Sequence, residues 1–214
     1  MINRDAMIQA VEEHRKDKLP LEHYKEILKD FDPQVMAEGS ACPYDKELKR
    51  FDVPLMSHHF YVSYPEGVIT EEDGKECQDL HMMTLILRYL ENAKPQEPTG
   101  VNINYRDVSG GNHYFKTFEG RCLKRLAFSF GHNPEGFKRA MEAVGAEPVK
   151  GGDFAYRFNF IGNRYVTAIL WLADEEFPPE AQILFDQNVE TAFDAEDLAV
   201  VGDVFISILK NSAK

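Results

Sequence analysis

Runs of apolar residues in the second half of the chain predict three successive strands, at residues 154–160, 165–173 and 182–189. Gly162 and Asn163 separate the first two strands, and both residues tolerate positive φ, which indicates a tight hairpin turn. Short connections between consecutive strands are typical of antiparallel pairing. We therefore expect a three-stranded antiparallel meander here.

The first half of the chain has one region with the alternation of a strand. Apolar and polar positions alternate from Val53 to Tyr64, which predicts a single strand with His58 on its apolar face and His59 on the other. Pro65 to Gly67 is a turn signal, and residues 68–70 can return as the second strand of a hairpin.

Apolar residues at helical spacing predict the remaining elements. Asn133 and Asp194 are the expected N-cap residues of the last two helices, and Gly145 is placed to end the first of these. The predicted helices cover residues 3–19, 21–31, 72–92, 114–130, 134–144 and 195–210.

The order of these elements predicts the fold class and the domain organisation. Helices, a hairpin, helices, a meander and a final helix indicate an α+β fold, in which an antiparallel sheet (a hairpin plus a three-stranded meander) packs against helices. We expect a helical N-terminal extension at residues 1–45 and a single α+β domain at residues 46–214. Residues 94–100 contain two prolines and are expected to form a linker or an exposed loop.

Composition narrows the classes of protein that fit. The 214 residues are 43% hydrophobic and include 15 Phe and 9 Tyr, so the chain can bury a core without a disulfide or a metal. A net charge of -12 disfavours nucleic acid and anionic membranes as partners. We expect no membrane span and no signal peptide. Cys42, Cys77 and Cys122 lie far apart, which argues against a metal site and fits a cytoplasmic protein.

An acidic cluster is the first candidate for chemistry. Asp174, Glu175 and Glu176 follow the second strand of the meander, where paired carboxylates could act as a general acid and base. A small enzyme built on Glu175 and Glu176, with His59 and Arg164, is one hypothesis. The alternative is a charged turn that ends the strand, because successive strand residues point to opposite faces.

Histidines and aromatic residues suggest a different kind of site. His58 or His113 could be an axial ligand of a haem or a corrinoid, and Tyr165 and Trp171 could form the walls of its pocket. The alternatives are a core histidine, a surface histidine and an ordinary packed tryptophan. No nucleotide-binding, HExxH or GxSxG motif occurs in the sequence.

Several short motifs resemble the bacterial domain-of-unknown-function family 3786, which is found mainly in anaerobes. The resemblance covers roughly residues 45–211, and its most specific part is the DEEFP…ILFD stretch between Asp174 and Asp186. The other matching segments are Gly110-Gly111 with Tyr114-Phe115, Leu126-Ala127 with Phe130-Gly131, Val144-Gly145, Gly152-Asp153 and Leu170-Trp171. Some relatives carry a cysteine-rich iron–sulfur segment, but this chain lacks those cysteines.

These observations favour a ligand-binding or accessory protein, with a tetrapyrrole (haem or corrinoid) as the expected ligand. The anaerobic setting of the family makes a link to tetrapyrrole metabolism conceivable, by association only. Two other classes stay open: the acid/base enzyme described above, and a pure protein-interaction module, whose mark would be a large exposed apolar patch.

Overall fold

A computed structural model describes residues 20–213. Residues 20–28 form a helix, and the predicted helix at residues 3–19 lies outside the described residues. The other helices are α2 (Pro33–Ser40), α3 (Leu80–Asn92), α4 (Gly111–Phe118), the π-helix η2 (Glu119–Lys124), α5 (Arg125–Phe130), α6 (Pro134–Ala143) and α7 (Ala195–Ser212). Short 3-10 turns are η1 (Tyr105–Asp107) and η3 (Gln187–Thr191).

The strands form one sheet with the order β4-β3-β2-β7-β8-β9-β5, and the pairings are antiparallel. Their bounds are β1 (Tyr44–Asp45), β2 (Arg50–Leu55), β3 (His58–Ser63), β4 (Ile69–Glu71), β5 (Asn102–Asn104), β6 (Glu147–Pro148), β7 (Phe154–Ile161), β8 (Arg164–Trp171) and β9 (Glu180–Asp186). The predicted meander is confirmed as β7-β8-β9. The α+β class with an antiparallel sheet is also confirmed.

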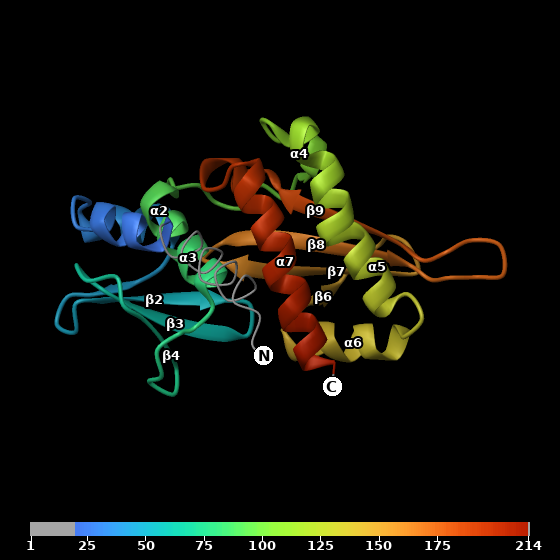
Figure 1. Ribbon diagram of the computed structural model, residues 1–214, viewed down its shortest axis with the longest axis horizontal. Helices are drawn as coiled ribbons and strands as arrows, with labels where there is room; N and C mark the ends of the chain where they lie inside the picture. Colours follow the sequence, from blue (N-terminus) through green and yellow to red (C-terminus); the bar gives the residue numbers. More distant parts are fainter. Residues whose placement is uncertain (1–19, 214) are drawn as a thin grey trace, which may run out of the picture.

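The sheet consists of two halves that are joined at one position. β2 pairs with β7 at a single position, Leu55 opposite Ile161, so the β2-β3-β4 half and the meander join only at a corner. Figure 1 shows the two halves side by side, with α7 and α5 crossing one face of the meander. Phe158 of β7 packs edge-on against Phe205 of α7, with ring centroids 5.4 Å apart, which places the core between these layers.

Two predicted elements were wrong in their bounds. The single strand from Val53 to Tyr64 is two strands, because Met56 adopts φ 52° and turns the chain between β2 and β3. The predicted helix 72–92 begins only at Leu80, where the carboxylate of Asp79 accepts hydrogen bonds from the first turn of α3. Residues 72–79 form turns and loop instead.

Residues 20–45 pack closely with the rest of the molecule. Leu21, Leu28 and Met36 are buried in the same hydrophobic cluster as the sheet and α3. The predicted division between residues 45 and 46 stays a prediction. Within residues 20–213, no helix is both long and apolar enough to cross a membrane.

Candidate functional site

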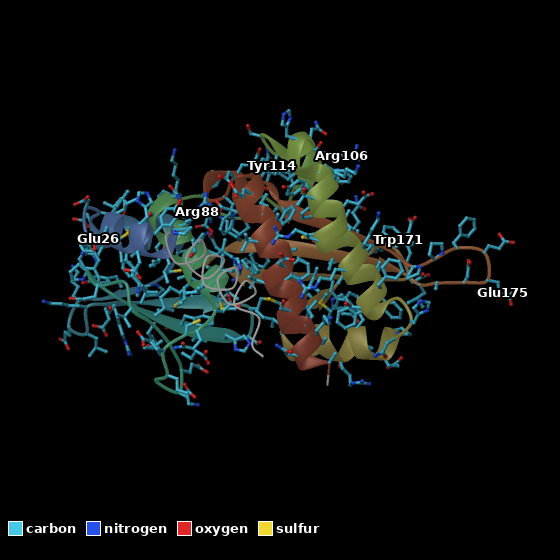
Figure 2. All side chains as sticks on the ribbon, in the orientation of Figure 1. Glu26, Arg88, Arg106, Tyr114, Trp171 and Glu175 are labelled. Carbon is cyan, nitrogen blue, oxygen red and sulfur yellow. The ribbon has the colours of Figure 1, made fainter. Side chains whose placement is uncertain are left out.

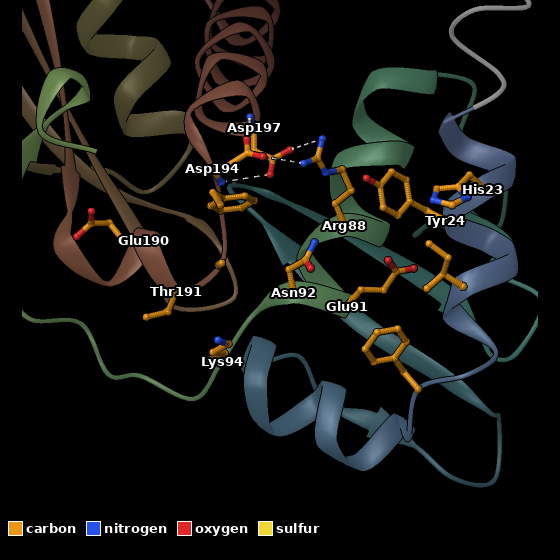
Figure 3. Close-up of a pocket in the computed structure, with 14 residues that line it drawn as sticks. His23, Tyr24, Arg88, Glu91, Asn92, Lys94, Glu190, Thr191, Asp194 and Asp197 are labelled. Atoms are coloured by element: carbon orange, nitrogen blue, oxygen red, sulfur yellow. Dashed lines mark hydrogen bonds and ion pairs between the residues drawn. The ribbon is translucent and has the colours of Figure 1, made fainter. Parts of the chain in front are cut away.

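A cavity of about 580 Å³ opens between the helix at residues 20–28, α3 and the segment that leads into α7. Figure 3 shows Arg88 and Glu91 of α3, Asp194 and Asp197 of the segment leading into α7, and His23 and Tyr24 of the first helix around this cavity. Its size falls within the range of natural small-molecule sites. The lining residues are His23, Tyr24, Ile27, Phe31, Arg88, Glu91, Asn92, Lys94, Glu190, Thr191, Ala192, Phe193, Asp194 and Asp197. We call this cavity the Arg88 pocket.

Helical spacing places three polar side chains of α3 in the Arg88 pocket. Arg88, Glu91 and Asn92 are separated by three and four residues, so they lie on one face of the helix. Their neighbours Leu87 and Leu90 are buried in the core. The amphipathic pattern that packs α3 against the core therefore also places these three polar side chains at the cavity.

The start of α7 supplies the opposite wall. Asp194 is the N-cap residue, and its carboxylate accepts a hydrogen bond from the Asp197 backbone N–H at 2.8 Å. The Asp197 carboxylate accepts in return from the Asp194 N–H at 3.3 Å. This capping box fixes both carboxylates at the positive end of the helix dipole.

Arg88 joins the two walls. One guanidinium nitrogen lies 3.1 Å from Asp194 Oδ2, and the other lies 3.0 Å from Asp197 Oδ1. The Asp197 side chain is only 4% exposed, so this ion pair is largely shielded from water. Removing one partner of such a pair leaves an uncompensated buried charge.

Burial changes the acidity of two carboxyls in the pocket. Desolvation raises the pKa of Glu91 to about 7, against the opposing effect of Arg88. Desolvation likewise raises the pKa of Asp197 to about 7, with Arg88 again opposing it. Glu91 Oε1 is buried and has no hydrogen-bond partner among the described residues. The pocket therefore holds a carboxyl that can exchange a proton near neutrality and can accept a ligand donor.

Aromatic side chains line the same cavity. Tyr24 lies beneath the Arg88 guanidinium, 5.4 Å from ring centroid to carbon, and Phe193 stacks on Tyr89 with centroids 5.3 Å apart. Phe31 lies at the end of the first helix and is 38% exposed. Aromatic faces and carboxylates together favour an organic cation as the bound group.

The residues of the predicted acid/base enzyme lie on separate parts of the molecule. Glu175 and Glu176 are exposed in the loop between β8 and β9, and Figure 2 shows Glu175 at the tip of this projection. Arg164 is 1% exposed, and its guanidinium donates to Lys94 O at 2.9 Å, which ties a loop to β8. His59 lies 2.9 Å from Asp52 at the surface of the β2-β3 hairpin. The structure does not bring these four residues together.

The four residues of the predicted tetrapyrrole site are also dispersed. His58 is the first residue of β3 and lies on the same strand face as the buried Phe60 and Val62, but its side chain is exposed at the end of the strand. His113 is exposed on α4. Tyr165 and Trp171 share one face of β8, but six strand residues put them roughly 20 Å apart. Trp171 is 38% exposed, and the Arg157 guanidinium lies 3.7 Å from the ring centroid of Tyr165.

The cysteines and potential metal ligands of residues 20–213 form no reactive cluster. No group of three His, Cys, Asp or Glu side chains within this range is arranged to hold a metal ion. Cys42, Cys77 and Cys122 are free and buried. Burial raises the pKa of Cys42 and of Cys122 to about 12, which keeps both thiols protonated.

Sequence reasoning missed the Arg88 pocket. A signal was present, since Arg88, Glu91 and Asn92 recur on one face of an otherwise apolar helix. The acidic partners of Arg88 come more than 100 residues later, at the cap of α7. Such a pairing has no local signature, so only the packing of α3 against α7 shows it.

Comparison with known proteins places the chain in a family. Searches of the curated proteins and of the solved structures each find no match. The model of the family described as Domain of unknown function (DUF3786) matches residues 32–207. This match covers most of the chain, including the pocket residues from Arg88 to Asp197 and the acidic stretch that carries the resemblance. The chain therefore belongs to the DUF3786 family.

Proposed function

We propose that this protein is a cytoplasmic ligand-binding protein that holds a small organic cation, such as an amine, in the Arg88 pocket. The observation that carries the proposal is the buried, unpartnered carboxyl oxygen of Glu91 in a cavity with aromatic walls. Burying a polar atom without a partner is costly, so a ligand donor at this oxygen would recover the lost hydrogen bond. The free cysteines support a reducing compartment.

Charge in the pocket favours a cation over an anion. Arg88 is already paired with Asp194 and Asp197, so it contributes no free positive charge. The other charged side chains in the lining are Glu91, Glu190 and Lys94, so the cavity has an excess of carboxylate. An ammonium group would lie between the Glu91 carboxylate and the faces of Tyr24 and Phe31.

The acidity of Glu91 makes binding of an amine depend on pH. Because the pKa of this carboxyl is raised to about 7, Glu91 is protonated at pH 5 and ionised at pH 8. A cation binds the ionised form, so affinity should rise with pH up to about 8. At pH 6, binding should release a proton from Glu91, and the measured heat should then depend on the ionisation enthalpy of the buffer.

Calorimetry with matched probes tests the proposal. Phenethylamine, putrescine and tetramethylammonium are the cationic probes, and 2-phenylethanol is the neutral counterpart of the first. We expect at least one cation to bind at pH 8, no binding of 2-phenylethanol, and at least tenfold weaker binding to Glu91→Gln. Glu26→Gln, at an exposed position of the first helix, is the control and should bind normally.

If a cationic probe binds, two outcomes would still contradict a cation site. One is equal binding of phenethylamine and 2-phenylethanol, which would show that the apolar part alone is recognised. The other is unchanged affinity of Glu91→Gln for every cation that binds. Binding of none of the three cations at pH 8 would also reject the proposal for amines of this size.

The tetrapyrrole hypothesis stays a prediction with its own test. His58, His113, Tyr165 and Trp171 do not form one wall, so the geometry favours the Arg88 pocket as the ligand site. Titration of the purified protein with haem and with cobalamin, followed by absorbance, decides the matter. No spectral change with either compound would reject that hypothesis.

A further inference from the structure

The loop at residues 172–179, between β8 and β9, projects from the body of the protein beside α5 (Figure 1). Phe177 in this loop is 65% exposed, and Phe128 on α5 is 64% exposed. A hollow of about 300 Å³ lies between the two segments. Its lining residues are Glu119, Leu123, Lys124, Ala127, Phe128, Pro178, Pro179, Glu180 and Ala181. We call this hollow, together with Phe177, the loop groove.

Hydrogen bonds hold the projecting loop in one shape. Asp174 Oδ1 accepts from the Glu176 N–H at 2.8 Å and from the Phe177 N–H at 2.7 Å. The Asp174 N–H in turn donates to Phe177 O at 3.1 Å. Phe177 therefore sits on a closed turn, and little conformational entropy would be lost when a partner covers it.

The base of the loop is fastened to α5 by close packing. The Ala173 N–H donates to Gly131 O at 3.3 Å, just after α5 ends. A Cβ atom at Gly131 would lie 2.1 Å from Cβ of Pro179, so glycine is required for this contact. The groove thus has two fixed walls, α5 on one side and Pro178 with Pro179 on the other.

Carboxylates outnumber basic groups in and beside the loop groove. Glu119 and Glu180 line it, and Lys124, which also lines it, lies 3.9 Å from the Glu119 carboxylate. Asp174, Glu175 and Glu176 belong to the projecting loop, with Glu175 at its tip (Figure 2). Exposed aromatic side chains beside an excess of carboxylates complement a partner with apolar anchors and basic flanks.

We propose that the loop groove docks a segment of a protein partner that carries an apolar anchor flanked by Lys or Arg. Covering the two exposed Phe side chains removes apolar surface from water, and the excess of carboxylates accelerates association with a basic segment. A second copy of this chain fits poorly, because it would bring two acidic surfaces together in a chain of net charge -12. This docking is separate from ligand binding in the Arg88 pocket.

Selection from a displayed peptide library on the full-length protein tests the proposal. We expect the enriched peptides to combine an aromatic or aliphatic residue with flanking Lys or Arg. Synthetic copies of these peptides should bind at least tenfold more weakly to the Phe128→Ser/Phe177→Ser double variant. Affinity should also fall as salt is raised from 50 to 300 mM, because the carboxylates of the projecting loop are exposed.

A matched variant controls for general loss of surface hydrophobicity. Val35→Ser/Leu48→Ser removes two apolar side chains, 65% and 59% exposed, from other surfaces and should bind the peptides normally. All variants should melt near the wild type, since each altered side chain is exposed. Sedimentation velocity of the wild type should show a monomer at the concentrations used for binding.

Three results would overturn the proposal. Failure to enrich any peptide would show that the groove binds no such segment. Enriched peptides that lack basic residues, or that bind the Phe128→Ser/Phe177→Ser variant as tightly as the wild type, would place recognition elsewhere. A wild-type dimer that becomes a monomer in that variant would make a second copy of the chain the occupant.

Discussion

Replacing Glu91 with Gln should make the protein more stable at alkaline pH. The pKa of this carboxyl rises from its ordinary value of 4.5 to about 7 because burial opposes the ionised form. The folded state therefore holds the proton more tightly than the unfolded state. Between pH 4.5 and 7 the unfolded chain has released this proton while the folded protein retains it, so stability falls as pH rises through that window.

The size of the effect follows from the two pKa values. A change from 4.5 to about 7 corresponds to about 3 kcal/mol for a group shielded from water. Glu91 is only partly buried, and solvent screening reduces the expected effect to about 1–2 kcal/mol once this carboxyl is ionised. Gln has nearly the same shape and carries no charge, so Glu91→Gln escapes this cost. The variant should match the wild type below pH 4.5, apart from a constant offset, and exceed it by about 1–2 kcal/mol at pH 8. For a chain of this size that is an increase in Tm of about 2–8 °C.

Unfolding followed by circular dichroism at pH 5, 6, 7 and 8 measures this difference. Asp197 contributes a fall in the same direction to both proteins, since burial raises its pKa to about 7. The difference in stability between Glu91→Gln and the wild type at each pH therefore gives the contribution of Glu91. Glu175→Gln, in the exposed loop, is the control and should follow the wild type at every pH. A Glu91→Gln curve parallel to the wild type between pH 5 and 8 would refute the reasoning.

Three further substitutions probe other contacts, with Gly120→Ala as the matched control for the last of them. Arg88→Met should lower the free energy of unfolding in urea by about 3 kcal/mol at pH 8, because it leaves the ionised Asp197 unpaired. The loss should be smaller at pH 5, where Asp197 is protonated. Equal losses at the two pH values would mean that this carboxyl is not buried as described. Arg164→Met removes hydrogen bonds to Lys94 O and Thr191 Oγ1, so the free energy of unfolding should fall by about 2–3 kcal/mol. Hydrogen exchange should become faster at residues 94–100 but not in α7. Gly131→Ala should lower stability by about 1–3 kcal/mol, because the added methyl forces the loop away from α5. Gly120→Ala should raise stability by up to about 1 kcal/mol, because no atom lies within 4 Å of its added methyl. Indistinguishable melting of the two variants would argue against the close contact between Gly131 and Pro179.

Local signals explain which elements could be predicted from the sequence. The α6 helix has its cap at Asn133 and a proline at its first position, and both operate within one turn. The separation of β2 from β3 was not predicted, because the alternation of apolar and polar residues continues through the turn. Met56 adopts a positive φ there, and the pattern of side chains does not indicate this backbone conformation. The start of α3 was placed too early because the apolar pattern alone did not reveal the cap at Asp79.

The residues of the candidate site could not be predicted from local signals of this kind. Residues chosen for their chemistry proved to be exposed: Glu175 lies in a loop and His58 at the first position of β3. Arg164 was chosen as a possible catalytic partner, and its buried guanidinium instead ties residues 94–96 to β8. Whether such a side chain is exposed or is buried and holds neighbouring segments in place depends on the contacts that it makes across the folded protein.

The sequence by itself determined the meander and the last two helices, because hydrophobic periodicity, turn residues and helix caps act over a few neighbouring positions. Its short motifs also resemble the family whose model matches residues 32–207. The tertiary structure alone decided where the two halves of the sheet join, which carboxyls are desolvated and which side chains line the Arg88 pocket. The pKa of Glu91 and the pairing of Arg88 depend on burial by segments distant in the chain. Burial and charge pairing of this kind arise only when those segments pack together.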